Sequence, residues 1–488
     1  MMDAGSNPDV KVVQTNEGVE DGQNKCPKCG ATDIAFNMNT SMLRCNFCRF
    51  EFQADRAVGL DTDLSKLEGK VVGAGATEIA ADAESIITLK CSSCAAEVVI
   101  DTDEAVGARC HWCRNTLSIA QQVPNGAVPD MVLPFRVPKD QAQTAITSFV
   151  KKRRFFAHPR FKAEFCTENI MGVYMPFMLV GINSQAHFSG QGERLIRKRR
   201  VGTGRNQRTV YDADLYEVDR KFDLVIDGLP IISSSERLGG ATSGRTDNII
   251  NAIKPFDHEN CVKWDANYLK GIASEKRDTN IEDLKRPIET KAKDVARHRA
   301  NETIREYDRG VRWRRQDLAI KGQQWKASYL PIWLYSYQQK KSGGQSLLHY
   351  VAVNARSRKT MGSVPVNKLK LFLFSLVVQI FGTVAGLFLA FFAFDEPEAM
   401  AALALLLSGF LYYSYYYMKY RNTRARFEHE KDAKSTISNV TRRDQLIKRL
   451  NGLSNSRMRD ANNMDVNYSG GGSQSGIGSL IDEVKSHF

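Results

Sequence analysis

The sequence predicts a multidomain α+β protein with two small zinc ribbons, a mixed α/β cytosolic domain and a two-helix transmembrane hairpin. Three observations lead to this prediction: a cysteine pattern that occurs twice, a central region with both strand-like and helix-like patterns, and two uncharged apolar stretches near the C-terminus. The chain has 488 residues and a formal net charge of +13, so it is too long for one ordinary domain and clearly basic.

The predicted organisation has eight parts. These are a disordered N-terminus (1–24), zinc ribbon 1 (25–54), a linker (55–84), zinc ribbon 2 (85–120), a cytosolic α+β domain (121–367), a transmembrane helical hairpin (368–420), a basic cytosolic segment (421–468), and a flexible Gly/Ser linker with a short amphipathic tail (469–488).

Cysteines give the most specific signal. CxxC followed by a second CxxC occurs twice with the same internal spacing, and four thiolates in two short turns match the tetrahedral shell that zinc prefers. The predicted ligands of two structural Zn²⁺ ions are Cys26, Cys29, Cys45 and Cys48, and Cys91, Cys94, Cys110 and Cys113. Gly30 is expected to take the positive φ that brings an N–H close to sulfur.

Disulfides and thioredoxin-like redox pairs are the alternatives to zinc. Coupled pairs at a fixed spacing, between β-like runs such as Leu43–Phe52 and Glu97–Ile100, favour zinc over both. Four sulfurs close each shell, so the sequence argues against a catalytic zinc with an open position.

Two apolar stretches predict the membrane part. Leu371–Phe394 and Ala399–Met418 carry no charge, and each is long enough to cross a hydrocarbon core of about 30 Å as a helix. The spans are predicted at about 371–394 and 399–418. Lys and Arg flank the pair on the outside and the connecting loop is acidic, which predicts an inner-membrane protein with both termini in the cytoplasm. Gly382 and Gly386, with Ala404 and Ser408, are expected to let the two helices pack closely.

The central region mixes both periodicities. Lys139–Arg154 has apolar residues on one side of a helix, and Lys270–Arg315 is a charged helical region with a thin apolar stripe. Between them, alternating apolar residues predict a long β-hairpin. Its basic tip contains Arg194, Arg197, Lys198, Arg199, Arg200, Arg205 and Arg208. This tip is a candidate contact for anionic lipid or for nucleic acid, and a solvated loop is the alternative.

The C-terminal tail carries a short helical pattern. Leu480, Ile481, Val484 and Phe488 recur at helical spacing behind a Gly/Ser-rich tether. Such a segment is a candidate for docking into the groove of a partner protein, and a frayed terminus is the alternative.

The order of these motifs resembles a known family. Two CxxC…CxxC ribbons, Leu133-Pro134-Phe135, Tyr329–Tyr337, Tyr350–Pro365 and then apolar spans resemble the bacterial TFIIB-type zinc-ribbon membrane proteins, which are often labelled primosomal protein N′ or replication-restart helicase-like. The chain has no Walker A motif, so a helicase activity does not follow. Some relatives are linked to PspA-type membrane-stress systems, which implies a PspA-like cytosolic protein as a partner.

These observations predict a non-enzymatic, membrane-anchored adaptor that recruits cytosolic proteins to the membrane, with its basic segments held at anionic lipid. The resemblance adds a role in the membrane-stress response. No nucleophile, base or open metal site forms a catalytic constellation in the sequence. A membrane-tethered nucleic-acid-binding protein is the alternative, and the basic tip lacks the interleaved aromatic residues that would favour it.

Overall fold

The computed structural model describes most of the chain between residues 10 and 447. The described residues are 10–13, 25–38, 40–55, 57, 63–77, 86–90, 97–101, 129–202, 208–234, 249–269, 272–274, 277, 279–340, 346–392, 405–421 and 434–447. The second set of predicted zinc ligands, Arg205 and the predicted C-terminal tail lie outside these ranges.

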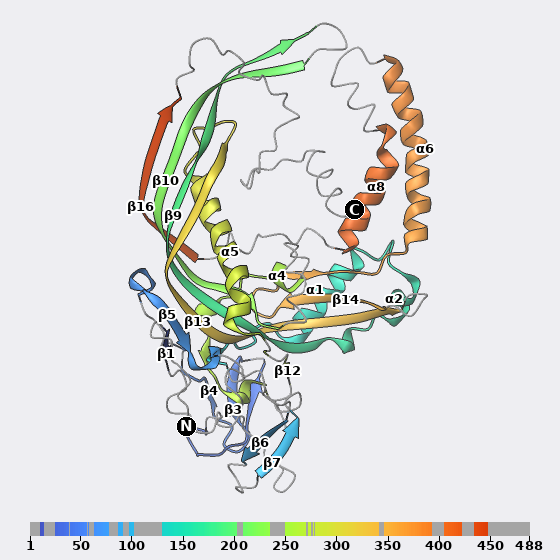
Figure 1. The fold of residues 1–488 in the computed structure, drawn as a ribbon. Coiled ribbons are helices and arrows are strands. Elements are labelled where there is room, and N and C mark those ends of the chain that lie inside the picture. Colours follow the sequence, from blue (N-terminus) through green and yellow to red (C-terminus); the bar gives the residue numbers. More distant parts are fainter. Residues whose placement is uncertain are drawn as a thin grey trace.

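A single 11-stranded sheet organises the molecule, with the path β1-β5-β13-β9-β10-β16 and short strands at its sides (Figure 1). Its strands are β1 (Val10–Val13), β5 (Gly69–Gly73), β8 (Met131–Val132), β9 (Met171–Val201), β10 (Arg208–Ile232), β11 (Val262–Lys263), β12 (Ala273–Ser274), β13 (Val311–Lys340), β14 (Ser346–Asn354), β15 (Thr360–Gly362) and β16 (Lys434–Leu446). Two smaller sheets contain β2 (Ile34–Asn37), β3 (Met42–Cys45) and β4 (Glu51–Phe52), and β6 (Ile86–Lys90) and β7 (Glu97–Asp101).

Helices cover parts of the large sheet. The α-helices are α1 (Lys139–Lys151), α2 (Pro159–Glu164), α4 (Ile249–Ala252), α5 (Ile281–Glu302), α6 (Lys368–Phe392) and α8 (Ser408–Arg421). Short 3₁₀ turns are η2 (Leu64–Lys66), η3 (Ala74–Ala76), η4 (Thr167–Asn169), η6 (His258–Asn260) and η7 (Ala266–Leu269).

Three very long strands, β9, β10 and β13, form the centre of the sheet and bend strongly along their length (Figure 1). The pairing of these strands is irregular at Asp212/Ala213 and Ile226/Leu229 between β9 and β10, and at Trp313/Arg315 and Ile320/Gly322 between β9 and β13. A β-bulge inserts an extra residue and increases the local twist, which explains how these strands curve without breaking. α5 lies in the bend, and Leu284, Ile288 and Val295 are buried with apolar residues of all three strands.

Several predicted elements are confirmed. α1 buries Ala142, Ile146 and Val150, and α5 begins with a capping box between Asn280 and Asp283. The long hairpin is β9–β10, in which Val201 pairs with Arg208 across the turn. Two segments with the pattern Tyr-x-Pro, Tyr174–Pro176 and Tyr329–Pro331, lie opposite each other, since Tyr174 pairs with Pro331 and Pro176 with Tyr329 in the antiparallel pair of β9 and β13.

The predicted fold class is wrong. Strands of one large sheet dominate the described residues, and among these residues one helix, over Lys368–Phe388, is long and apolar enough to cross a membrane. The second predicted span falls partly outside the described residues, and its described part, α8, has 14 residues. At about 1.5 Å per residue, α8 is shorter than the hydrocarbon core. The two-helix transmembrane hairpin is therefore not supported.

Three segments that were expected to lie outside the folded domain contribute strands. β1 belongs to the predicted disordered N-terminus, β5 to the predicted linker and β16 to the predicted basic segment. β5 runs parallel to β13, β1 runs parallel to β5, and β16 pairs antiparallel with β10. β1 and β5 are too short, and β16 is too polar, to give a clear periodic signal, and all three pair with strands that are distant in the sequence.

α6 and α8 pack against each other through small and polar residues. A Cβ atom at Gly382 would lie 1.8 Å from Ser408 Oγ, so the glycine is required for the close approach. Gln379 accepts a hydrogen bond from Gly409 N (3.0 Å) and donates to Leu406 O (2.6 Å). The predicted close approach of the two helices through small residues is thus found at Gly382 and Ser408, whereas Ala404 lies outside the described residues.

Candidate metal centre and associated polar sites

Two short turns bring four cysteine sulfurs together. Cys26 and Cys45 lie on or beside the small sheet β2–β3–β4, and Cys29 and Cys48 follow each of them by three residues. The backbone closes both turns in the same way, since Gly30 N donates to Cys26 O (2.8 Å) and Arg49 N donates to Cys45 O (2.9 Å).

Both turns also use the left-handed backbone region. The φ angle is +72° at Gly30, as predicted, and +58° at Arg49, where a non-glycine residue accepts the same conformation. Cys48 N lies 3.5 Å from Cys45 Sγ and donates to it, the type of N–H to sulfur contact expected in such a turn.

The distances between the sulfurs fit one metal ion. Cys26 Sγ is 3.5 Å from Cys48 Sγ, Cys29 Sγ is 3.6 Å from Cys45 Sγ, and all four lie within 4.8 Å of one another. A tetrahedral ion with metal–sulfur bonds of about 2.3 Å places its sulfurs about 3.8 Å apart. The first cysteine cluster is therefore able to hold a metal ion.

The pKa values of these thiols also favour a metal ion in the cluster. Burial acts to raise the pKa of Cys26, but backbone N–H groups of Cys29 and Lys28 and the neighbouring thiols lower it to about 7. The backbone N–H of Ala31 acts to lower the pKa of Cys29, but burial and the three neighbouring thiols raise it to about 12. The four thiols thus cannot all lose their protons easily while they lie so close together. A bound cation would stabilise the four thiolates and allow all of them to form.

The cysteine cluster is fixed to the large sheet. Phe36 of β2 packs against Tyr268 of η7, with ring centroids 5.3 Å apart, and Ala54 N donates to the Tyr268 hydroxyl (3.2 Å). Lys263 N donates to Asp55 O (2.8 Å). Within the second turn of the cluster, between Cys45 and Cys48, Phe47 is 82% exposed.

Part of the second predicted ribbon is described. β6 and β7 pair antiparallel, and β7 contains the predicted β-like run Glu97–Ile100. The sulfur positions of Cys91, Cys94, Cys110 and Cys113 lie outside the described residues, so the second metal site stays a prediction.

Ion pairs neutralise part of the basic hairpin tip. Arg197 and Arg199 both lie 3.4 Å from carboxylate oxygens of Asp212 on the opposite strand. Lys198 Nζ lies 5.9 Å from the centre of the Tyr211 ring. Arg194 and Arg200 are exposed on β9, and Arg208 begins β10. The tip is thus an ordered two-stranded ribbon at these positions, with less free charge than its sequence suggests.

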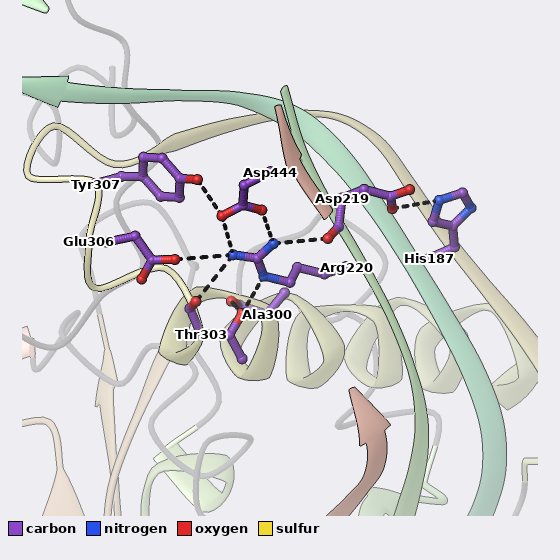
Figure 2. Close-up of polar contacts among 8 residues, drawn as sticks. All are labelled: His187, Asp219, Arg220, Ala300, Thr303, Glu306, Tyr307 and Asp444. Carbon is purple, nitrogen blue, oxygen red and sulfur yellow. Dashed lines mark hydrogen bonds and ion pairs between the residues drawn. The ribbon is translucent and has the colours of Figure 1, made fainter. Parts of the chain in front are cut away.

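A buried arginine that the sequence does not single out lies where β10, β16 and the end of α5 meet (Figure 2). The Arg220 side chain is fully buried, and its guanidinium contacts both carboxylate oxygens of Asp444 on β16. It also donates to Thr303 Oγ1 (3.0 Å) and to the Asp219 carbonyl (2.9 Å) and lies 3.4 Å from Glu306. The Tyr307 hydroxyl donates to Asp444 as well.

This cluster fastens β16 to the rest of the sheet. A buried guanidinium needs a charged partner and several acceptors, and here those groups come from three separate segments. His187 extends the network, since it lies 2.9 Å from the Asp219 carboxylate on the neighbouring strand. The sequence around Arg220 shows a single arginine in an alternating strand. It does not indicate that the partner is Asp444, which lies 224 residues further along the chain.

Two adjacent hollows, of about 220 and 400 Å³, share Asp227, Gly228, His258 and Glu259. Charged residues around them pair with each other: Arg356 with Asp257 (2.6 Å) and Lys434 with Glu259 (3.3 Å). Burial raises the pKa of the Cys261 thiol to about 12, so this cysteine is a poor nucleophile.

Comparisons with known proteins identify a distant relative. The chain is 23% identical over 372 residues to the protein named "Uncharacterized protein YdjG" of Bacillus subtilis (strain 168), a match that covers 75% of this chain and 95% of YdjG. No family model and no solved structure matches the chain. The resemblance to the TFIIB-type zinc-ribbon membrane proteins is therefore not shown. The findings support only a distant relationship to YdjG and a cluster of four cysteines that is able to bind a metal ion.

Proposed function

We propose that the protein is a membrane-attached, non-enzymatic adaptor that presents a zinc ribbon to cytosolic proteins at the membrane surface. The observation that carries this proposal is the uncovered apolar surface of α6. Large side chains around α6, including Phe372, Ile380, Phe381 and Phe388, are more than half exposed. A soluble protein rarely leaves so continuous an apolar surface in water, because its burial in lipid is favourable.

The buried side of α6 is a narrow stripe that faces α8. Leu371, Ser375, Gly382 and Gly386 are buried. Val378, Gln379 and Thr383 are half-buried, and the other positions between Leu371 and Gly386 are exposed. A helix that is apolar on nearly all sides is typical of insertion into the hydrocarbon core, whereas a surface-bound helix has one polar face. This supports membrane insertion of α6 with the sheet on the water side.

Zn²⁺ is the proposed ion of the cysteine cluster. Four sulfur donors at tetrahedral distances suit Zn²⁺ better than the hard cations, and a closed shell supplies structure and no chemistry of its own. Cys26, Cys29, Cys45 and Cys48 would hold it and thereby fix the turn that carries Phe47. An exposed aromatic side chain on a rigid support is a typical anchor in protein–protein recognition. Reduced cysteines also agree with a cytoplasmic location of the sheet.

Nucleic-acid binding remains the alternative, with weaker support. The basic hairpin tip would have to contact phosphates, yet Arg197 and Arg199 share Asp212 as a partner. Protein partners, including a PspA-like one, remain a proposal that rests on the resemblance of the sequence.

Membrane extraction tests the anchor. The variant Ile380→Lys/Val384→Lys places two cations in the exposed surface of α6, and it should move the protein from the carbonate-resistant membrane fraction to the soluble fraction. The matched control Lys285→Ala/Arg286→Ala changes two exposed residues of α5 and should leave the distribution unchanged. If the wild-type protein is fully released by carbonate, the membrane part of the proposal is wrong.

Partner capture tests the ribbon. Phe47→Ala should remove specific cytosolic proteins from those recovered with the membrane-embedded protein, while Lys66→Ala, an exposed residue of η2, should not. Metal content should be equal in the two variants, because neither changes a ligand. Identical sets of recovered proteins for wild type, Phe47→Ala and Cys29→Ser would contradict recruitment through the ribbon.

A further inference from the structure

A run of four cations and two aromatic residues lies at the base of α6. Lys151, Lys152, Arg153 and Arg154 end α1 and begin the following loop, and Phe155 and Phe156 come next. Phe156 is buried, and its ring packs edge-on against Tyr416 of α8 at 5.2 Å. Phe155 is 54% exposed, and its ring meets that of Phe374 in α6 at 5.1 Å.

The loop is held firmly to both apolar helices. Phe156 N donates to the Tyr420 hydroxyl (2.8 Å), Asn367 N donates to Phe156 O (2.8 Å), and Arg153 Nε donates to Lys419 O (3.2 Å). Arg153 therefore positions the loop. Its neighbours Lys152 and Arg154 are exposed to solvent.

Three cations converge beside Phe155. Lys370 Nζ in the first turn of α6 donates to Phe155 O (3.1 Å), and Lys162 Nζ of α2 donates to the same oxygen (3.5 Å). Lys370 Nζ also lies 4.0 Å from the centre of the Phe155 ring. Burial and the positive charges of Lys370 and Arg154 lower the pKa of Lys162, as expected where its ammonium group lies near these two cations.

No carboxylate of the described residues forms an ion pair with Arg154, Lys162 or Lys370. Other cations of this protein do find such partners: Arg197 and Arg199 share Asp212, and Lys321 pairs with Asp223. The ammonium groups of Lys162 and Lys370 each have N–H donors beyond the one used at Phe155 O. Together with the nearby Arg154 guanidinium, they could donate hydrogen bonds to one anionic ligand.

The position of this cluster relative to α6 indicates the ligand. The exposed apolar surface of α6 begins with Leu369 and Phe372, next to Lys370 in sequence. If α6 is inserted in lipid, the cluster lies at the depth of the headgroups, where cations attract anionic phospholipid and aromatic side chains are enriched.

We propose that Arg154, Lys162 and Lys370 form a binding site for the phosphate of an anionic phospholipid, with Phe155 packed against its upper acyl chain. Phe155 O orients the two ammonium groups, and the hydrogen bonds of the loop to Asn367 and Tyr420 hold the site at the end of the apolar helix. This inference rests on the proposed membrane attachment and assigns a lipid to a surface different from the hairpin tip.

Lipid retention tests the site in the full-length protein. The protein is reconstituted into vesicles of phosphatidylcholine alone or of seven parts phosphatidylcholine to three parts phosphatidylglycerol, and then re-extracted into mild detergent. Retained lipid is counted by mass spectrometry. Wild type should retain phosphatidylglycerol in preference to phosphatidylcholine. Each cation removed should weaken phosphatidylglycerol binding about fivefold, so Arg154→Gln/Lys162→Gln/Lys370→Gln should weaken it about 100-fold.

Control variants make the result specific. Lys285→Gln/Arg286→Gln/Lys293→Gln removes the same charge from exposed positions of α5 and should retain phosphatidylglycerol like wild type. Lys162→Arg/Lys370→Arg should keep most of the binding, because the charge and the donors remain. An unchanged melting temperature and normal insertion into phosphatidylcholine vesicles show that the triple Gln variant is folded.

Two results would overturn the site. One is equal retention of phosphatidylglycerol by wild type and the triple Gln variant. The other is displacement of phosphatidylglycerol by inorganic phosphate at equal concentration, which would identify a soluble anion as the ligand. Failure of the wild type to enter phosphatidylcholine vesicles would instead contradict the proposed anchor, so the two proposals fail in different ways.

Discussion

At the scale of single residues, Arg220 is the fully buried charge that depends most on its neighbours for hydrogen bonds and a countercharge. It is fully buried, and Asp444 supplies the main countercharge. Removal of one partner from a buried ion pair leaves the other charge uncompensated, which costs about 3–5 kcal/mol. Asp444 is 24% exposed, so the lower end of this range is appropriate.

We therefore predict that Asp444→Ala destabilises β16 by about 3 kcal/mol. Hydrogen exchange should show the effect as faster exchange of the β16 amides, with little change in β9 and β13. Arg442→Ala is the control, because Arg442 is an exposed residue of the same strand. Equal exchange rates in the two variants would show that the buried pair does not hold the strand.

The same residue gives a pH prediction. Burial acts to raise the pKa of Asp444, but hydrogen bonds from Arg220 and Tyr307 hold it below its ordinary value. A carboxyl group with a lowered pKa stabilises the fold above its unfolded pKa of about 3.9, and this stabilisation disappears as the pH falls through the folded pKa. β16 exchange should accelerate below about pH 4, and in Asp444→Asn this dependence should be absent.

A prediction for the cysteine cluster is made at the same scale. Cys29→Ser removes one of four ligands and should lower the zinc content by about one equivalent, whereas Cys166→Ser, outside the cluster, should not change it. Elemental analysis of the purified protein measures both. A wild-type protein without any bound metal would contradict the assignment.

Single residues also show what the sequence could predict. The four cysteines and Gly30 were predictable because a metal site needs fixed ligand types at fixed local spacing. The contacts of Arg220 and the proximity of Lys162 to Lys370 were not, because the residues involved come from distant segments. The run of Lys151–Phe156 was a visible signal, since four cations followed by two aromatic residues are typical of a membrane interface.

Among the elements, α6 and its contact with α8 depend on one glycine. Gly382→Leu should force the helices apart, because a Cβ atom alone would lie 1.8 Å from Ser408 Oγ. A lower melting temperature in detergent is the expected result. Ala385→Leu adds the same side chain at an exposed position of α6 and should have little effect. Equal melting temperatures would argue against the packing of α6 on α8.

Elements with strong local patterns were predictable and those without were not. α1, α5 and the β9–β10 hairpin have clear periodicity and were found. The expected second span failed because its residues continue into α8, which is rich in tyrosine and packs against Phe156 at the sheet. β1, β5 and β16 were missed because their stability comes from pairing with strands that are distant in the sequence, which no local window contains.

For the whole molecule, metal removal should have a local effect. The cysteine cluster contacts the large sheet mainly through Phe36, Ala54 and Tyr268, whereas the sheet has its own apolar core around α5. A strong chelator should increase hydrogen exchange over 25–55 and leave β9, β10 and β13 protected. Loss of protection throughout the sheet would show that the metal supports the entire fold.

The connection between α8 and β16 has a consequence for synthesis of the protein. β16 completes the edge of β10, but it follows both apolar helices in the chain, and Arg220 meets Asp444 across 224 residues. N-terminal segments leave the ribosome first, and pairings of high contact order form late. The edge of β10 therefore stays unpaired throughout translation of α6 and α8, and β16 can cover it only after both helices have been synthesised.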